Sequence, residues 1–273
     1  MKTKKLLLIA FLLAVFISAL YDGCTNETTG PPAEVPGFKP TIRLKLYSTY
    51  QYTNDTILPS GLHQRKPGII TNDTIKTFSN FNGKNAFGIF SHTIGQPSVI
   101  YYVSYDSTAG LYYQWGITNL INPSQSPSWD VAANFAASRS SNWVIGQIND
   151  TLTFSIPSIG TITVPFSGPL TGKVADSTIV VTTSAVPDTI HCYRIEYNAN
   201  ISGTTVINLV TITFSASIYV EYYIGYYSPQ FPNNPSGLVE LRLNPFNITT
   251  SPYIITIQEG GYDRILQSYT IAP

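Results

Sequence analysis

The chain has 273 residues, which is long enough for one large all-β domain or two small domains, each with a buried core. Charged residues make up 11% of it and aromatic residues 13%, including 19 tyrosines, whereas soluble domains usually carry about 25% charged residues. This composition excludes a disordered chain, and the lack of a basic stripe or Arg cluster excludes a nucleic-acid-binding protein.

The first 23 residues have the form of a secretory signal peptide. Lys2, Lys4 and Lys5 precede an uncharged apolar run at residues 6–20, LLLIAFLLAVFISAL. A membrane-spanning helix needs about 20 apolar residues, and Asp22 ends this run sooner. We therefore expect residues 1–23 to be removed on export, with a short uncleaved anchor as the alternative.

Cys24 marks the next boundary, and two cleavage positions fit the sequence before it. Residues 17–19, ISA, fit ordinary signal peptidase, which would release a soluble protein. Gly23-Cys24 resembles instead the end of a bacterial lipobox, although residues 21 and 22 depart from the usual pattern. We expect the second cleavage, with Cys24 as the lipidation site and the membrane as a partner through that lipid.

Residues 24–40, CTNETTGPPAEVPGFKP, are polar, rich in Pro and Gly, and without apolar periodicity. Such a segment is typical of a flexible tether between a bilayer and a folded domain. The predicted domain organisation is therefore a signal peptide at 1–23, a lipidated tether at 24–40, and a single β-rich domain at 41–273.

Alternation of apolar and polar residues predicts strands along the rest of the chain. In residues 41–53, TIRLKLYSTYQYT, Ile42, Leu44 and Leu46 alternate with residues of the other face. Further candidates, bounded by Gly, Pro, Asn or Asp, lie at 68–78, 86–92, 98–106, 111–117, 143–148, 151–157, 160–166, 174–183, 189–199, 204–224, 237–243, 252–258 and 262–271. The predicted fold class is all-β, an antiparallel open barrel or a β-sandwich. At most one short helix is expected, at 128–139 with Ser128 as its N-cap.

Three Asn-Asp motifs are predicted to be hairpin connections. TNDTI occurs at 53–57 and 71–75, and INDTL at 148–152, each with Asn-Asp between β-formers. Asn and Asp tolerate left-handed geometry and bond their own backbone, which favours turns. The same chemistry predicts turns at SGT, SIGT, STAG and EGG, which are residues 202–204, 158–161, 107–110 and 259–261.

Two aromatic clusters are the best candidates for a binding surface. They are YYVSYDSTAGLYYQWG at 101–116 and ASIYVEYYIGYYSPQFP at 216–232. Their aromatic residues fall on both faces of a strand, so some of them line a second surface, although ordinary sheet packing is the competing interpretation. The candidate ligand-binding residues are Tyr101, Tyr105, Tyr112, Trp115, Tyr222 and Tyr226.

No motif in the sequence predicts an enzyme, a metal site or a cofactor. The acidic residues are scattered singly, the three histidines lack metal-ligand spacing, and nucleophile-elbow and phosphate-loop motifs are missing. Strand alternation places His191 and Cys192 on opposite faces, so this histidine cannot activate this cysteine. If Cys24 carries lipid, Cys192 is a free thiol, which is usually buried; otherwise a Cys24–Cys192 disulfide is the alternative.

From Asp188 onward the chain resembles the C-terminal half of uncharacterised envelope lipoproteins common in Bacteroidota. The resemblance lies in DTIHCYRIEYNANISG, a Tyr-rich strand ending YYIGYYSP, GLVELRL at 237–243, and the closing RILQSYTIAP. It implies an open antiparallel barrel similar to lipoprotein-carrier folds, with an apolar concavity for a hydrophobic ligand or a partner. This chain departs from those carriers in having almost no helix to fill the concavity.

These observations favour a bacterial cell-envelope lipoprotein, facing the periplasm or the cell surface, with a non-enzymatic binding or structural β domain. The alternative is a carbohydrate-binding module of an exported polysaccharide-handling system, with the Tyr and Trp clusters as stacking platforms. A closed apolar concavity favours a hydrophobic ligand, and a flat exposed aromatic row favours a glycan. An enzyme is a third possibility, which requires carboxylates from distant strands to meet in one cleft.

Overall fold

The computed structural model describes residues 40–122, 124–139, 141–156, 160–182, 189–207, 209–252 and 256–273. These residues form an antiparallel all-β fold, as the sequence predicts, and no helix among them is long and apolar enough to cross a membrane. The elements are β1 Thr49–Ile57, β2 His63–Phe81, β3 Lys84–Thr93, β4 Val99–Asp106, β5 Leu111–Trp115, α2 Ile117–Ile121, β6 Trp129–Asn134, β7 Trp143–Ile156, β8 Gly160–Thr182, β9 Thr189–Ile207, β10 Val210–Gly225, β11 Gly237–Leu243, β12 Phe246–Ser251, β13 Thr256–Glu259 and β14 Gly261–Thr270. Cys24 and the predicted signal and tether up to residue 39 lie outside the described part.

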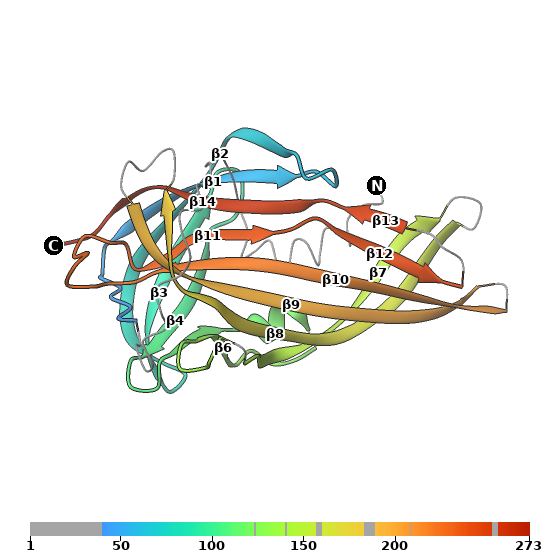
Figure 1. Ribbon diagram of the computed structural model, residues 1–273, viewed down its shortest axis with the longest axis horizontal. Helices are drawn as coiled ribbons and strands as arrows, with labels where there is room; N and C mark the ends of the chain where they lie inside the picture. Colours follow the sequence, from blue (N-terminus) through green and yellow to red (C-terminus); the bar gives the residue numbers. More distant parts are fainter. Residues whose placement is uncertain are drawn as a thin grey trace.

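One continuous sheet of fourteen strands curls into a nearly closed barrel. Its strand order is β6-β5-β4-β3-β2-β1-β14-β11-β10-β9-β8-β7, with β12 paired to β10 and β13 to β12. The long strands β8, β9 and β10 run along the longest axis, and β3 and β4 lie at one end of it (Figure 1). Of the two predicted architectures, the structure therefore has the barrel and not the sandwich of two sheets.

Side chains, not a backbone ladder, hold the two ends of the sheet together. Trp143 at the start of β7 donates its indole N–H to the carbonyl of Val131 in β6, at 2.9 Å. The hydroxyl of Tyr197 in β9 donates to the neighbouring carbonyl of Ala132, also at 2.9 Å. These two bonds satisfy carbonyl groups of β6 that would otherwise form an open sheet edge.

The barrel interior is built from the alternate residues of each strand. In β10, even-numbered residues from Ile212 to Ile224 are buried, whereas the odd-numbered residues from 211 to 217 are exposed. The same alternation places Tyr193, Ile195 and Ala199 of β9 inside. Burial of apolar side chains on the inner face of the long strands is the main term that stabilises such a sheet.

The three Asn-Asp motifs do not form hairpin connections, so that prediction is wrong. Asn54-Asp55 lies inside β1, Asn72-Asp73 inside β2, and Asn149-Asp150 inside β7. Asp55 and Asp73 are both buried. Asp55 faces His63 of the next strand at 4.0 Å, and Asp73 pairs with Arg264, which is far away in the sequence. The predicted turn at 202–204 also lies inside a strand, β9, and the turn at 107–110 is confirmed.

The predicted helix at 128–139 is also wrong. Residues 129–134 form β6, which pairs with β5 along the sheet edge, and the described helix is α2 instead. The predicted strand at 41–53 begins only at Thr49, and residues before it make isolated backbone contacts such as Tyr227 N–H to Thr41 carbonyl at 2.7 Å. The paired strands 143–148 and 151–157, and 160–166 and 174–183, each merge into one long strand.

Candidate functional site

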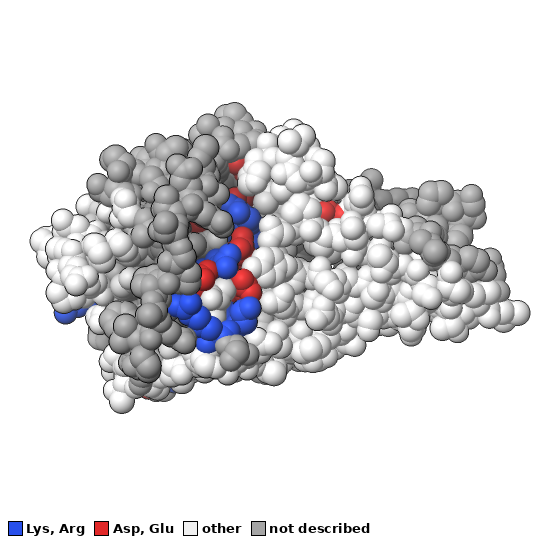
Figure 2. All heavy atoms as spheres, in the orientation of Figure 1, with Lys and Arg blue, Asp and Glu red and all other residues white. Residues whose placement is uncertain are grey.

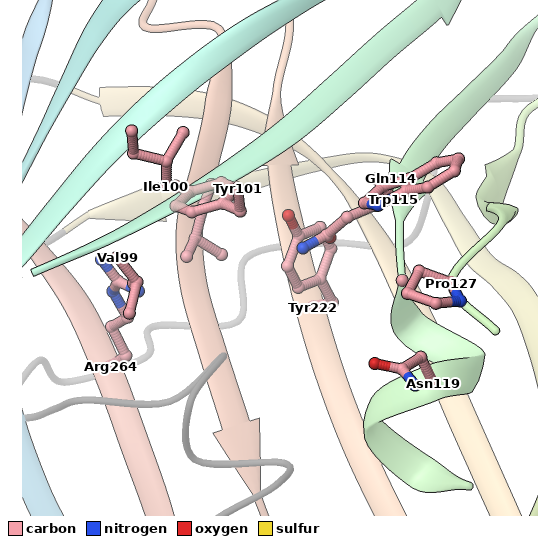
Figure 3. A pocket seen from close by; sticks show the side chains of 11 residues that line it. Val99, Ile100, Tyr101, Gln114, Trp115, Asn119, Pro127, Tyr222 and Arg264 are labelled. Atoms are coloured by element: carbon pink, nitrogen blue, oxygen red, sulfur yellow. The ribbon is translucent and has the colours of Figure 1, made fainter. Parts of the chain in front are cut away.

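A cavity of about 350 Å³ opens between β4, β5 and α2 on one side and β10, β11 and β14 on the other. Most of its wall is apolar or aromatic, and Figure 3 shows the side chains that line it. The lining residues are Val99, Ile100, Tyr101, Gln114, Trp115, Gly116, Asn119, Pro127, Tyr222, Leu238 and Arg264. A concave, mainly apolar site with a few polar groups is the usual form of a small-molecule site.

The floor of the cavity holds a buried ion pair. Arg264 Nη2 lies 2.9 Å from Asp73 Oδ2, and both side chains are almost fully buried. The Tyr101 hydroxyl donates to the same carboxylate oxygen at 2.6 Å, and the Arg264 guanidinium lies 4.0 Å from the centre of the Tyr52 ring. Burial acts to lower the pKa of Arg264, but the neighbouring Asp73 outweighs it, so the guanidinium stays charged.

A second, much smaller cavity of about 20 Å³ lies beside the first and shares Tyr101, Tyr222 and Leu238 with it. Tyr50 and Tyr52 line it and donate their hydroxyls to the carbonyls of Ser236 and Leu238, each at 3.0 Å. This space is about the size that one water molecule needs. The main cavity therefore provides the volume for a ligand.

A loop and the short helix α2 form the rim of the cavity beside β5. Gly116 adopts φ +82 and turns the chain from β5 into α2, a backbone conformation that favours glycine. The buried Asp130 of β6 accepts hydrogen bonds from the Thr118 N–H at 2.8 Å and the Thr118 hydroxyl at 3.0 Å. These bonds satisfy orphan donors at the start of α2 and fix the rim to the sheet.

Four of the six predicted ligand-binding residues lie at these cavities. Tyr101, Trp115 and Tyr222 line the main cavity, and Tyr112 lines the small one. Burial raises the pKa of the Tyr101, Tyr112 and Tyr222 hydroxyls above the ordinary value, so they remain neutral hydrogen-bond donors. Whether these residues bind a ligand stays a prediction.

Tyr105 and Tyr226 do not line either cavity. They belong to a ring cluster in the barrel interior, in which Phe135 lies between Tyr105 and Tyr193, with ring centres 6.3 Å and 5.0 Å away. Tyr226 packs against Tyr193 at 5.1 Å, and the Tyr105 hydroxyl bonds the carbonyl of Pro40. These two tyrosines therefore pack the core, which is the competing interpretation of the aromatic clusters.

Three polar residues of the cavity, Gln114, Asn119 and Arg264, were not among the predicted ligand-binding residues. Gln114 stands two residues after Tyr112 in β5, so strand alternation alone places both on the same face. Arg264 stands between Asp263 and Ile265, and no local pattern indicates that its partner Asp73 comes from β2. Gln114 was therefore detectable from the sequence, and Arg264 was not.

A row of charged residues crosses the face of the sheet that points away from the cavity. Figure 2 shows Lys, Arg, Asp and Glu atoms gathered in one band on a face that is otherwise mostly uncharged. Six of them stand directly opposite one another in successive strands β1, β14, β11, β10, β9 and β8, namely Asp55, Asp263, Arg242, Glu221, Glu196 and Lys173. We call these six residues the charged row.

Arginine side chains hold the carboxylates of the charged row and its neighbours. Arg242 contacts Glu240 at 2.6 Å, Asp263 at 3.2 Å and Glu221 at 3.7 Å. Arg194 contacts Asp176 at 2.8 Å, and Lys173 contacts Glu196 at 3.1 Å. Acidic residues that stand singly in the sequence are therefore brought together by the pairing of distant strands.

The remaining candidate groups are Cys192, His191 and any set of side chains that could hold a metal ion. Cys192 is a free and fully buried thiol, as expected for an unpaired cysteine. His191 points away from it, and its ring stacks on Phe231 with ring centres 3.5 Å apart. Within the described ranges, no three His, Cys, Asp or Glu side chains are arranged to hold a metal ion.

No protein-family model matches this chain, and no curated protein matches it. Two solved structures have a distant similarity to it. One is a "putative lipoprotein" from Parabacteroides distasonis, with 10% sequence identity and a TM-score of 0.39, covering 85% of this chain and 99% of that chain. The other is a "putative exported protein with YmcC-like fold" from Bacteroides fragilis, with 9% identity and a TM-score of 0.35, covering 85% of this chain and 100% of that chain. Fold does not imply function, which is decided by the cavity and the residues that line it.

Proposed function

We propose that this is a lipid-anchored protein of the bacterial cell envelope whose β domain binds a small, mainly apolar ligand and catalyses no reaction. The observation that carries the proposal is the cavity of about 350 Å³ beside Tyr101, Trp115 and Leu238. It is roughly twice as large as the ~150 Å³ apolar cavity that holds a benzene ring. A ligand of about a dozen non-hydrogen atoms, or the end of a longer chain, fits this space.

The placement of charge supports binding rather than catalysis. Arg264 is the one charged side chain among the described lining residues, and Asp73 neutralises it at 2.9 Å. The carboxylates that do meet, in and beside the charged row, lie on the other face of the sheet and contact Arg242, Arg194, Lys173 or His63. A general acid or base needs a reactive group within reach of the substrate, which this cavity does not offer among its described residues.

A titration tests the binding proposal. We expect 1-octanol to bind the mature full-length protein and to change its tryptophan fluorescence, because Trp115 lines the cavity. Val99→Trp places a large ring at the cavity wall and should abolish this binding. The matched control is Val144→Trp, because Val144 is 70% exposed on β7, and it should bind 1-octanol like the wild type. Binding that Val99→Trp leaves intact would contradict the cavity as its site.

The proposed lipid anchor rests on the signal segment, Cys24 and the polar tether in the sequence. Intact-mass analysis of the exported protein should show cleavage before Cys24 and the added mass of acyl chains. The Cys24→Ser variant should carry no acyl chains and should leave the membrane fraction. A wild-type mass that corresponds to an unmodified chain beginning at Leu20 would contradict the anchor.

Glycan binding is the second candidate function, and one aromatic cluster favours it. Tyr102 stacks on Phe81 at 3.7 Å, and Trp115 and Trp129 stand edge-on to Phe81 at 5.2 and 6.1 Å. Trp129 is outside the cavity lining, so Trp129→Ala separates the two candidates. Maltotriose binding that Trp129→Ala removes and Val99→Trp preserves would favour the glycan function.

A further inference from the structure

Gln114 presents an unpartnered amide to the cavity. Its side chain lines the cavity, yet the residue is only 4% exposed. In the part of the chain that the structure describes, no hydrogen bond joins this amide to another group. A ligand that bonds this amide gains a hydrogen bond, which is worth about 0.5–1.5 kcal/mol net.

The neighbouring polar groups are already engaged with one another. Asp130 stands opposite Gln114 in the β5–β6 register, but Thr118 and Ser128 donate to its carboxylate. Asn119 donates its amide to the carbonyl of Gln125 at 2.6 Å. Among the described residues of the cavity wall, Gln114 is therefore the side-chain amide with neither its N–H groups nor its oxygen in a hydrogen bond.

The charge of the cavity restricts the ligand class. Arg264 is the one charged side chain among the described lining residues, and its guanidinium already pairs with Asp73, which lies outside the lining. An ion buried here would lose its hydration without gaining a counter-ion, which is costly. A side-chain amide offers one acceptor oxygen and two N–H donors, and so matches a neutral group that has both a donor and an acceptor.

We propose that Gln114 recognises the neutral polar head of an amphiphile, of the carboxamide or similar donor–acceptor class, whose apolar tail lies along the rest of the cavity. This inference rests on the proposed binding function and specifies its ligand. In Figure 3, Gln114 and Asn119 lie on one side of Tyr222, and Val99, Ile100 and Arg264 lie on the other. The head therefore contacts β5, and the tail contacts Val99 and Ile100 of β4, beside the paired Arg264.

Three probes with the same chain length test the inference by calorimetric titration of the mature full-length protein. They are octanamide, octanoate and octylamine, whose heads are neutral, anionic and cationic at pH 7. We expect octanamide to bind at least about tenfold more tightly than either charged probe, because burial of an unpaired charge is costly. Tighter binding of octanoate or octylamine would overturn the proposed ligand class.

The variant Gln114→Leu keeps the size of the side chain and removes its amide. It should weaken octanamide binding about tenfold and leave the charged probes weak, since one hydrogen-bonded polar group is lost. Gln147→Leu is the matched control, because Gln147 is exposed on β7 and should bind octanamide normally. Circular dichroism checks folding, and Gln114→Met, which keeps the side-chain length, replaces Gln114→Leu if that variant unfolds.

The outcomes separate the two proposals. If none of the three probes binds the wild type, the proposed binding function is wrong and the role of Gln114 falls with it. If all three bind alike and Gln114→Leu changes nothing, the cavity binds ligands but Gln114 does not recognise their heads. In that case this inference is overturned and the binding function stands.

Discussion

Arg264 and Asp73, 191 positions apart in the chain, form an ion pair of 2.9 Å at the floor of the cavity. Arg264 belongs to β14 and Asp73 to β2, and β1 lies between these strands with Tyr52 under the guanidinium. The pair thus bridges three neighbouring strands inside the barrel. It also gives the cavity its neutral floor.

Breaking this pair should destabilise the protein strongly. Asp73→Ala leaves a buried guanidinium without its carboxylate, a change that typically costs about 3–5 kcal/mol in the free energy of unfolding. The double variant Asp73→Leu with Arg264→Met removes both charges and should recover much of that loss. Urea unfolding of the two variants measures both values. A single-variant loss below about 1 kcal/mol, or a double variant as unstable as the sum of its single changes, would contradict the pair's role.

Glu240, beside the charged row, should make stability depend on pH. Burial, followed by the neighbouring Asp263, raises the pKa of Glu240 to about 8, despite its 2.6 Å contact with Arg242. A carboxyl whose pKa is higher in the folded state favours folding while it is protonated. Its contribution is therefore fully present below about pH 4.5 and is lost as the pH rises through about 8.

Glu240→Gln removes this titration and keeps an acceptor oxygen for Arg242. Between pH 5 and pH 9, the free energy of unfolding of the wild type should fall by a few kcal/mol more than that of the variant. Glu259→Gln, a change on the distant strand β13, is the control and should keep most of the wild-type fall. Parallel pH profiles for the wild type and Glu240→Gln would show that Glu240 does not titrate in this range.

The contact between β6 and β7 that closes the barrel should be sensitive to Gly172. A Cβ atom at Gly172 would lie 2.4 Å from Trp143 Cζ2, so Gly172→Ala must displace the indole that bonds Val131. Overpacking of this kind costs about 1–3 kcal/mol. Thermal unfolding should show a lower Tm for Gly172→Ala, with Val144→Ala, at an exposed neighbour of Trp143, near the wild-type value. An unchanged Tm would mean that the indole is not held in place.

Cys192 should be unreactive and independent of redox conditions. It is fully buried, and burial, followed by Glu240, raises the pKa of its thiol. Native protein should not react with Ellman's reagent, and Cys192→Ser should cost about 1–3 kcal/mol by burying a hydroxyl. That cost should be equal in reducing and oxidising buffer. A loss seen only in oxidising buffer would instead indicate a disulfide with Cys24.

The sequence predicted the all-β class because alternation is local, but long-range pairing decided the remaining elements. Asn-Asp has strong turn propensity, yet Asp73 lies in a strand because Arg264 and Tyr101 bind its carboxylate there. Residues 129–134 resemble a helix in composition, yet their carbonyls accept bonds from Trp143 and Tyr197. Tertiary partners outweigh local propensity in both cases.

The residues of the candidate site were likewise only partly predictable from the sequence. Aromatic density indicated the strands of Tyr101, Trp115 and Tyr222, which do line the cavity. It also indicated Tyr105 and Tyr226, because sequence alone does not separate core rings from cavity rings. The cavity exists only where β4 and β5 face β10, β11 and β14, and this arrangement depends on the closure of the whole sheet.

A crystal structure with 8-bromo-1-octanol bound tests the central claim, that this cavity is a ligand site, most directly. The anomalous signal of bromine marks the position of the probe without relying on any assay. We predict a single strong bromine peak between Tyr101, Trp115 and Leu238, which disappears in Val99→Trp crystals. A bromine peak only on the outer aromatic surface near Trp129, or no peak in the cavity at saturating probe, would contradict the account.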